Sequence, residues 1–302
     1  MFKRIERNFD VSVVIPNYNG ENLLPDCLPY VIKAKDNPAN RIREIIVVDD
    51  DSQDKSIEVL KRFPGVKVIK HRINRGFSSS VNTGARSSKG KIIVLLNTDV
   101  KPSYDFLMSV LPHFSSPNVF AVSLHEEGYG WANGRFKDGF IVHSPGKQDE
   151  EVQETFWVNG GSGVFRRDYW MDLNGMDERI FSPFYWEDLD LSYRAQKRGF
   201  TLLWDPKSMV THKHESTLSR LPNRYVVRIQ ERNQLLFIWK NLTSVALFRK
   251  HVIGLTSRVL RHPGYVFVVF SALSKLGTVL KARKKELKEA KISDETIFAR
   301  FS

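Results

Sequence analysis

The sequence predicts an α/β fold: a mostly parallel sheet with helices on both faces, followed by a basic helical region at the C-terminus. Short apolar runs rich in Val and Ile recur along the first hundred residues, and segments with helical spacing separate them. Strands that alternate with helices are typical of right-handed βαβ units, which build parallel sheets. A change in charge and composition near residue 217 marks the C-terminal region.

The apolar runs are predicted to be buried strands. They span residues 11–15, 45–48, 66–69 and 92–96, and β-branched runs of this length are typical of strands that are covered on both faces. A helical spacing of apolar side chains begins at Leu23, between the first two runs. This alternation is the basis of the predicted sheet.

The middle of the chain is less regular. Residues 118–165 alternate aromatic residues with Gly and Asn, which indicates irregular strands and loops around the far edge of the sheet. Residues 187–198 are predicted to form a helix that stops at Gly199, and residues 200–204 a further strand.

The net charge of +12 is concentrated at the C-terminus. Residues 1–217 hold 29 Lys and Arg against 29 Asp and Glu, whereas residues 218–302 hold 17 against 5. We therefore expect an α/β domain over 1–217 and a helical region over 218–302. The single cysteine, Cys27, excludes an internal disulfide, and the first ten residues do not resemble a secretory signal, so a cytoplasmic location is expected.

A basic region of this kind can meet nucleic acid, anionic lipid or an acidic substrate. Its most apolar stretch, 265–280, is too short and too charged to cross a membrane, so an amphipathic helix on a membrane surface fits better. A helix packed on the α/β domain with a solvated basic face is the alternative. In the membrane interpretation seven basic residues are available to anionic head groups: Arg258, Arg261, Lys275, Lys281, Arg283, Lys284 and Lys285.

Polar side chains follow three of the predicted strands, at the edge where ligands bind in open α/β sheets. The three clusters are Pro16-Asn17-Tyr18-Asn19, Asp49-Asp50-Asp51-Ser52 and Asn97-Thr98-Asp99. A carboxylate such as Asp99, together with substrate phosphates, suits Mg²⁺ or Mn²⁺. Alternatively, Asp99 caps a helix that begins near Ser103.

Two adjacent acids, Glu187 and Asp188, open the helix predicted at 187–198. A hydroxyl is a poor nucleophile at neutral pH and needs a positioned base, and a carboxylate suits that role. The structural alternative is that the helix dipole favours acids in the first turn.

Seven motifs follow one another along the chain: VSVVIPNYNG, EIIVVDDDSQD, NRGFSSSVNTGA, GKIIVLLNTD, NGGSGVFRR, YWEDLDLSYRAQKRG and VTHKHES. In this order, from about residue 11 to 216, they resemble the family 2 glycosyltransferases of GT-A fold. The resemblance implies a nucleotide-sugar donor, a divalent metal (Mg or Mn) and inversion at the anomeric carbon. It also implies a glycan or lipid-linked acceptor, as in bacterial polysaccharide synthesis, and a peripheral position on the inner face of the cell membrane.

By this resemblance, one set of residues faces the donor: Pro16, Tyr18, Asn19, Asp49, Asp50, Gly76, Asn82, Asn97 and Asp99. Tyr18 would stack on the base, Asp49 and Asp50 would bind the nucleobase and ribose, and backbone amides at Gly76 would approach the diphosphate. The family often has Asp where this chain has Asn97, which leaves Asp99 as the acidic metal ligand. It usually has Gly in place of Asp51, a residue type that tolerates left-handed backbone.

The resemblance also assigns the catalytic and acceptor residues. Asp188 would be the general base, and Glu187 would hold the acceptor or orient its loop. Gly160, Gly161 and Trp186 would face the donor sugar and the acceptor.

His212 would join Asp99 on the metal, with His214 as the less favoured candidate. An Arg in the 228–233 stretch would reach the diphosphate.

Two other functions are compatible with parts of the sequence. A nucleotidyltransferase is expected to carry a Gly-rich loop with a basic residue after the first strand, which PNYNG does not provide. A non-enzymatic membrane- or nucleic-acid-binding protein would use the basic helices, but it would not require the aligned acids of a neutral 1–217 segment. The sequence therefore predicts glycosyl transfer, with no nucleic-acid partner.

Overall fold

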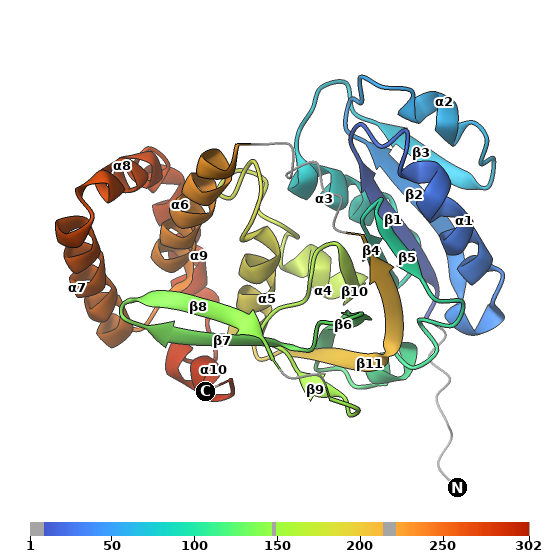
Figure 1. Ribbon diagram of the computed structural model, residues 1–302. Coiled ribbons are helices and arrows are strands. Elements are labelled where there is room, and N and C mark those ends of the chain that lie inside the picture. Colours follow the sequence, from blue (N-terminus) through green and yellow to red (C-terminus); the bar gives the residue numbers. More distant parts are fainter. Residues whose placement is uncertain (1–8, 147–148, 214–221, 302) are drawn as a thin grey trace, which may run out of the picture.

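The computed structural model describes residues 9–146, 149–213 and 222–301. It consists of a large sheet with helices on both faces and a layer of C-terminal helices beside it (Figure 1). The strands are β1 (Val11–Asn17), β2 (Ile42–Asp49), β3 (Val66–Lys70), β4 (Ile92–Leu96), β5 (Val100–Pro102), β6 (Val119–Glu126), β7 (Ala132–Lys137), β8 (Phe140–Pro145), β9 (Gln153–Glu154), β10 (Ser162–Arg166) and β11 (Thr201–His212). The helices are α1 (Leu24–Lys35), α2 (Ser56–Leu60), α3 (Phe77–Ser87), α4 (Arg167–Asp172), α5 (Glu187–Lys197), α6 (Asn223–Asn241), α7 (Val245–Arg261), α8 (Val266–Leu273), α9 (Leu276–Glu289) and α10 (Asp294–Ala299).

The large sheet has the strand order β3-β2-β1-β4-β10-β6-β11-β5, with β9 beside β11. Pairing is parallel from β3 to β4 and between β6 and β11. It is antiparallel between β10 and its neighbours β4 and β6, and between β11 and both β5 and β9. The predicted α/β fold is confirmed, and the parallel pairing is concentrated in the half that the sequence identified.

The middle of the chain differs from its prediction. β6 and β10 lie inside the sheet, between β4 and β11, rather than around its far edge. β10 is only five residues long and includes Gly163, so its sequence carries little strand signal. Its place in the sheet comes from pairing with β4 on one side and β6 on the other.

Helices cover both faces of the sheet. Successive side chains of a strand point to opposite faces, so each buried strand contributes apolar side chains to a core on either side. Val13 and Ile15 of β1 belong to a core with α1 and α2. Val14, between them, belongs to a second core with α3, α4 and α5. This arrangement explains why the runs of β1, β2 and β4 are almost entirely apolar. The prediction of a buried strand is wrong for β3, which lies at the edge of the sheet and is largely exposed.

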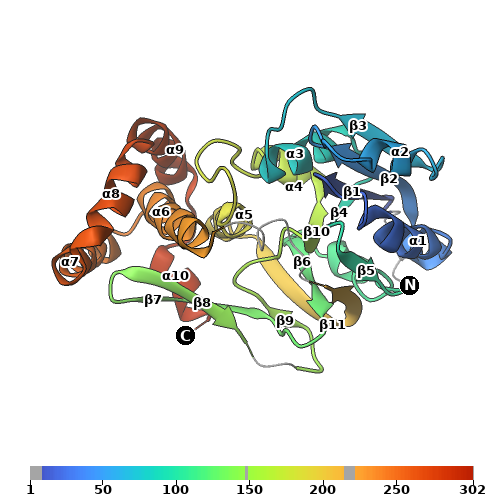
Figure 2. The same cartoon turned by 45° about the horizontal axis from the view of Figure 1, so that its top comes forward.

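The C-terminal helices share a third core with the rest of the chain. Phe237 of α6 and Phe298 of α10 pack in one cluster with Phe140, Phe156 and Tyr193. The β7–β8 hairpin runs out from the sheet to these helices (Figures 1 and 2). Residues on both sides of position 217 are therefore packed together.

Within the described residues, no single helix is long and apolar enough to span a membrane. A bent pair, Pro263–Leu273 with Leu276–Glu289, meets the length and composition requirements jointly, with 70° between its two halves.

Candidate active site

The carboxyl ends of β1, β2 and β4 border a pocket of about 490 Å³. β1 pairs in parallel with both β2 and β4, so all three strands end at one edge of the sheet. We call the part of the wall formed there and at the start of α3 the strand-end side: Pro16, Tyr18, Asp50, Gly76, Asn97 and Asp99. We call another part the loop side: Gly160, Gly161, Pro183, Phe184, Tyr185, Glu187 and Asp188.

Most of the residues predicted from the sequence line this pocket. The lining includes Pro16, Tyr18, Asp50, Gly76, Asn97, Asp99, Gly160, Gly161, Glu187 and Asp188. The other predicted residues, Asn19, Asp49, Asn82, Trp186 and His212, lie outside the lining.

Asn19 and Asp49 support the strand-end side from behind. The buried carboxylate of Asp49 accepts hydrogen bonds from Asn17 Nδ2 at 2.8 Å and Ser52 Oγ at 2.6 Å. Asn19 Oδ1 accepts the backbone amide of Gln53 at 2.8 Å. These contacts hold the turn after β2, in which Asp51 takes the left-handed backbone (φ 61°) that the sequence suggested.

Asp50 accepts hydrogen bonds from the backbone amides that directly precede α3. Its carboxylate accepts the amide of Arg75 at 2.9 Å and that of Gly76 at 2.7 Å, and His71 Nδ1 lies 2.6 Å away. A buried carboxylate needs such partners. These two amides are therefore already bonded to Asp50 in this structure, and the approach of backbone amides near Gly76 to a diphosphate stays a prediction.

Asn82 and Trp186 have packing contacts. Asn82 donates to the carbonyl of Met176 at 2.8 Å and accepts its amide at 3.0 Å, which joins α3 to the segment before α5. Trp186 is buried against Phe237 and His143.

Pairing of β5 with β11 brings His212 beside Asp99. Val100 lies opposite His212 in this antiparallel pair, and His212 Nε2 is 3.1 Å from Asp99 Oδ1. The other ring nitrogen, Nδ1, is 3.1 Å from a carboxylate oxygen of Glu126. Although burial opposes protonation, these carboxylates raise the pKa of His212 to about 9.

Asp99 does not cap a helix. The chain continues from it into β5, and the segment near Ser103 forms turns, so that alternative is wrong. Glu126, which the sequence reasoning missed, is the last residue of β6 and also accepts Ser162 Oγ at 2.6 Å. Recognising 119–126 as a sheet strand would have placed this carboxylate at a strand end.

Asp99 and His212 could together hold a divalent metal whose remaining coordination positions are filled by a bound substrate and water. Metal-binding histidines are usually oriented by a carboxylate on the second ring nitrogen, which is the place of Glu126. No group of three or more His, Cys, Asp or Glu side chains suited to a metal occurs in the described part of the chain. Phosphate and water oxygens would have to supply the remaining ligands. His214 lies outside the described residues.

Glu187 and Asp188 form a buried acidic pair at the start of α5. Asp188 accepts the amide of Leu189 at 2.7 Å and the amide of Gly160 at 3.3 Å. Burial raises the pKa of Asp188, and it raises the pKa of Glu187 to about 8 with help from the Asp188 charge. Glu187 Oε2 is buried with no hydrogen-bond partner among the described residues. With a pKa of about 8, Glu187 holds a proton at neutral pH.

The backbone that leads into this pair is strained. Tyr185 and Trp186 are consecutive residues in left-handed conformations, with φ of 68° and 77°. Such a conformation costs a non-glycine residue about 1–2 kcal/mol. It persists only where surrounding contacts impose it, and it is found most often at functional sites.

The family model described as "Glycosyl transferase family 2" matches residues 12–172, more than half of the chain. The chain belongs to glycosyl transferase family 2. Two curated relatives are a pre-mycofactocin glycosyltransferase of Mycobacterium tuberculosis and an undecaprenyl-phosphate 4-deoxy-4-formamido-L-arabinose transferase of Edwardsiella ictaluri. The first is 27% identical over 69% of this chain and 44% of its own length. The second is 35% identical over 30% of this chain and 29% of its own length. The chain thus spans less than half the length of these relatives.

Two solved structures with this fold confirm the predicted GT-A architecture. One is GalNAc-T7 with UDP, GalNAc and Mn²⁺, at a TM-score of 0.62 and 20% identity, covering 79% of this chain and 49% of the other. The second is a mannosyltransferase of Pyrobaculum calidifontis with GDP-Man and Mn²⁺, at a TM-score of 0.55 and 17% identity, covering 97% and 85%. The likeness at these identities concerns the fold.

Proposed function

We propose that this family 2 protein is an inverting glycosyltransferase that moves a sugar from a nucleotide-diphosphate donor to an acceptor hydroxyl. The observation that carries the proposal is that Asp99, at a strand end, and Asp188, at the start of α5, line one pocket. A donor diphosphate would lie on the strand-end side, near Asp99, with Tyr18 against its base. The acceptor would lie on the loop side, within reach of Asp188.

In the proposed reaction Asp188 accepts the proton of the acceptor hydroxyl while that oxygen attacks the anomeric carbon. A new carbon–oxygen bond forms as the bond to the diphosphate breaks, and the configuration inverts. The diphosphate leaves with the bonding electrons. A Mg²⁺ or Mn²⁺ ion held by Asp99 and His212 would neutralise the charge of the leaving diphosphate. The solved GT-A neighbours with Mn²⁺ support a divalent ion.

Glu187 would serve the acceptor. Its buried carboxyl has a free oxygen and is protonated near neutral pH, so it can donate a hydrogen bond that an ionised carboxylate cannot. A lipid-linked or glycan acceptor is supported by the undecaprenyl-phosphate relative. We infer a role in bacterial cell-surface polysaccharide synthesis on the cytoplasmic face of the membrane.

The test is a panel of nucleotide sugars assayed by release of nucleoside diphosphate, first without acceptor and then with candidate glycans and lipid phosphates. We expect Asp188→Asn to bind the active donor as wild type does and to lose transfer, because it lacks the base. Transfer by Asp188→Asn at the wild-type rate would remove Asp188 from this role. Failure of wild type to turn over any nucleotide sugar would contradict the proposed function itself.

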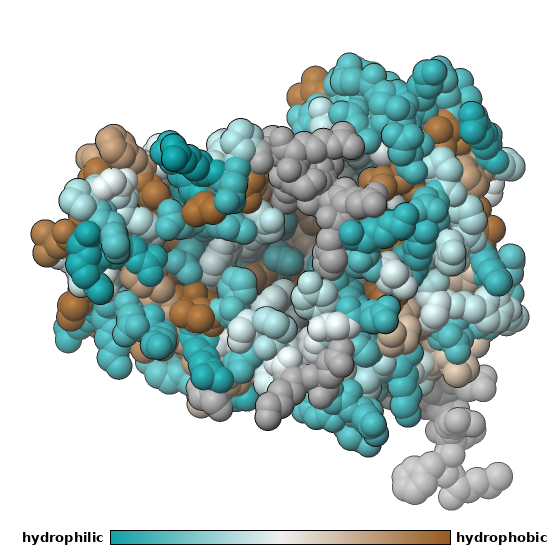
Figure 3. Space-filling model, in the orientation of Figure 1, coloured by the Kyte–Doolittle hydropathy of each residue, from teal (hydrophilic) through white to brown (hydrophobic). Residues whose placement is uncertain are grey.

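We also propose that α7, α8 and α9 bind an anionic membrane surface. The chain has no Asp or Glu between Glu231 and Glu286. Large apolar side chains project from α7 and α8: Ile253 is 69% exposed, Leu260 76%, Phe267 65% and Phe270 64%. Figure 3 shows apolar residues at the end of the molecule where these helices lie. A bilayer matches both properties, since it offers negative head groups and an apolar interior.

The structure revises which basic residues can serve this surface. Three of the seven expected ones are turned inward. Arg258 stacks on Phe140 with its guanidinium 3.4 Å from the ring centre. Arg283 donates to the carbonyl of Leu242 at 2.7 Å, and Lys275 bonds to the 179–186 segment. Arg261, Lys281 and Lys284 are exposed, and the seventh, Lys285, is half-buried with its Nζ 3.9 Å from a carboxylate oxygen of Glu289.

Flotation with vesicles of equal parts phosphatidylglycerol and phosphatidylcholine tests this surface. Phe267→Ser combined with Phe270→Ser should abolish flotation, and Lys281→Gln combined with Lys284→Gln should weaken it in a salt-dependent way. Tyr104→Ser with Met108→Ser is the matched control, because both side chains are exposed elsewhere on the molecule. Equal flotation of all variants would overturn the membrane proposal. It would also be overturned if the Phe267→Ser, Phe270→Ser variant still floats with vesicles but no longer self-associates.

A further inference from the structure

The 179–186 segment, called the acceptor loop below, contributes part of the pocket wall and leads directly into Glu187 and Asp188. Its backbone carbonyls accept hydrogen bonds from side chains of the C-terminal helices. Those side chains belong to Arg232, Asn233 and Lys275.

Asn233 makes the most of these contacts. From α6, its Nδ2 lies 2.8 Å from the carbonyl oxygen of Phe181 and 2.9 Å from those of Phe184 and Tyr185. Its Oδ1 accepts two bonds from Arg232, at 3.0 and 2.9 Å. The guanidinium thus fixes which end of the amide faces the loop, and the side chain is fully buried.

Lys275 and Arg232 hold the first half of the acceptor loop. Lys275 Nζ, from the junction of α8 and α9, donates to the carbonyls of Arg179 and Ile180 at 2.8 and 2.9 Å. Arg232 Nη2 donates to the carbonyl of Ser182 at 2.6 Å. Two residues of the 228–233 stretch, Arg232 and Asn233, therefore bond to the loop.

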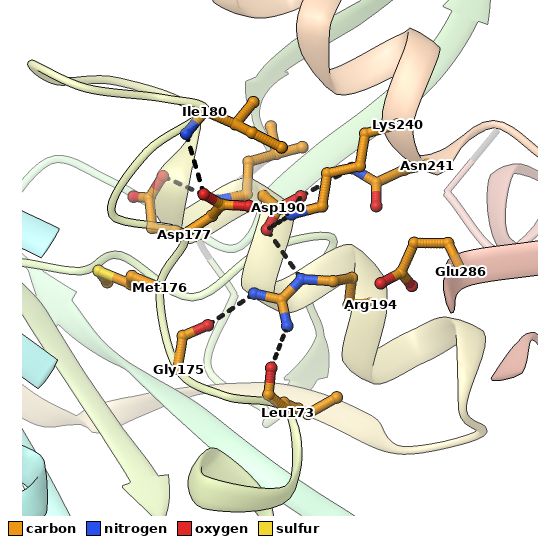
Figure 4. A network of polar contacts seen from close by, with 12 residues as sticks. Leu173, Gly175, Met176, Asp177, Ile180, Asp190, Arg194, Lys240, Asn241 and Glu286 are labelled. Carbon is orange, nitrogen blue, oxygen red and sulfur yellow. Dashed lines mark hydrogen bonds and ion pairs between the residues drawn. The ribbon is translucent and has the colours of Figure 1, made fainter. Parts of the chain in front are cut away.

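The helix that follows the loop is tied to the same layer (Figure 4). Lys240 of α6 reaches Asp190 on α5 and Asp177 before the loop, each at 2.9 Å. Asp190 also accepts Arg194 Nε at 2.8 Å. Lys240 thus bonds to residues on both sides of the acceptor loop.

The Asn233 contacts coincide with the strained backbone. Asn233 bonds the carbonyl of Phe184, which directly precedes the two left-handed residues, and the carbonyl of Tyr185, which lies between them. Strained conformations relax where the surrounding contacts are removed. Relaxation at Tyr185 and Trp186 would move Glu187 and Asp188, which follow them directly.

We propose that Asn233 is a positioning residue for Asp188, which it serves by fixing the carbonyls of the acceptor loop, and that Lys275 shares this task. The C-terminal helices are then part of the catalytic site as well as a layer that faces outward. This inference rests on the proposed glycosyl transfer, but it concerns how the base is held and leaves the donor chemistry unchanged.

The experiment compares Asn233→Ala with Gln234→Ala in the full chain. Gln234 is the next residue on α6 and also donates to a backbone carbonyl at 2.8 Å, that of Ile141 on β8, outside the loop. Asn233→Ala should lower kcat for transfer about 10²-fold, as a displacement of about 1 Å at a reacting group does. Its donor KM and its affinity for the nucleoside diphosphate should stay near wild type. Gln234→Ala should keep a kcat close to wild type at a similar melting temperature.

Equal kcat losses in the two variants, or wild-type kcat in a folded Asn233→Ala, would overturn the proposal. If Asn233→Ala does not fold, Lys275→Met and Lys275→Arg decide it. Lys275→Arg keeps a charged donor and should retain more of kcat than Lys275→Met, with donor KM unchanged in both; identical rates would contradict the proposal. Transfer by wild type in the same assay separates these outcomes from a failure of the proposed function.

Discussion

The strand-end side and the loop side of the pocket differ in what holds their functional groups. On the strand-end side, Asp50 and Asp99 follow strands of one sheet, and neighbouring strand ends and turns supply their partners. On the loop side, Glu187 and Asp188 follow a strained loop whose carbonyls are bonded by helices distant in the chain. Functional groups at the edge of a sheet are held by the sheet itself, whereas functional groups that follow a loop depend on the side chains that bond the loop.

The largest effect on the strand-end side is expected from Asp99→Ala. The variant removes one of the two side chains proposed to hold a metal, and charge stabilisation by a metal is worth several kcal/mol, so transfer should fall by about 10³-fold or more. Calorimetry should show that Mn²⁺ no longer strengthens binding of the nucleoside diphosphate, and EDTA should suppress the wild type alone.

Asp26→Asn is the control for this variant. Asp26 pairs with Lys101 and Lys213 near the same strands, but it lies outside the pocket. Full Mn²⁺ dependence in Asp99→Ala would contradict the ligand assignment.

On the loop side, Lys240→Met should cause the largest loss of stability. Lys240 pairs with the buried carboxylate of Asp190 and with the half-buried carboxylate of Asp177. Although burial raises the pKa of Asp177, the Lys240 charge helps to lower it to about 2. Breaking a buried ion pair by removing one partner costs about 3–5 kcal/mol. Urea unfolding should show this decrease in the free energy of unfolding.

Arg43→Met provides the comparison for Lys240→Met. The Arg43–Asp10 pair is exposed, so its loss should change stability by less than about 1 kcal/mol. Similar losses in both variants would mean that the Lys240 contacts stabilise the fold no more than an exposed ion pair does.

A smaller effect is expected from Glu126→Gln. The substitution keeps the shape of the side chain but removes the charge that orients His212, and loss of such a supporting carboxylate typically weakens metal binding about 10–100-fold. Titration with Mn²⁺ in the presence of nucleoside diphosphate would measure the change. An unchanged metal affinity would exclude His212 from the metal site.

A further expected effect concerns the pH dependence of stability. The pKa of Glu187 is raised from 4.5 to about 8 in the folded chain. The folded state therefore binds a proton more tightly than the unfolded state, and the free energy of unfolding falls as pH rises through this window. Glu187→Gln resembles the protonated acid and should remove this part of the slope in urea unfolding. A variant that keeps the wild-type slope would show that Glu187 is ionised in the fold.

The fold and most of the pocket could be predicted because their signals are local. The β-branched runs became β1 to β4, and the polar clusters after three of them lie at one sheet edge. The prediction failed for β6 and β10, whose places depend on pairing. It also failed for Arg258, Lys275 and Arg283, since sequence does not show whether a long basic side chain turns outward or toward a backbone carbonyl.

By itself the sequence determined the α/β class, the family and the acids at strand and helix ends. These features could be recognised because a buried strand and the acid that follows it are neighbours in the sequence. Only the tertiary structure decided that Glu126 supports His212 and that Asn233 holds the acceptor loop. The partners in these contacts come from separate strands and helices; Asn233 and Phe181 are 52 positions apart. Such pairs are set by how sheets and helices pack, and no local pattern records them.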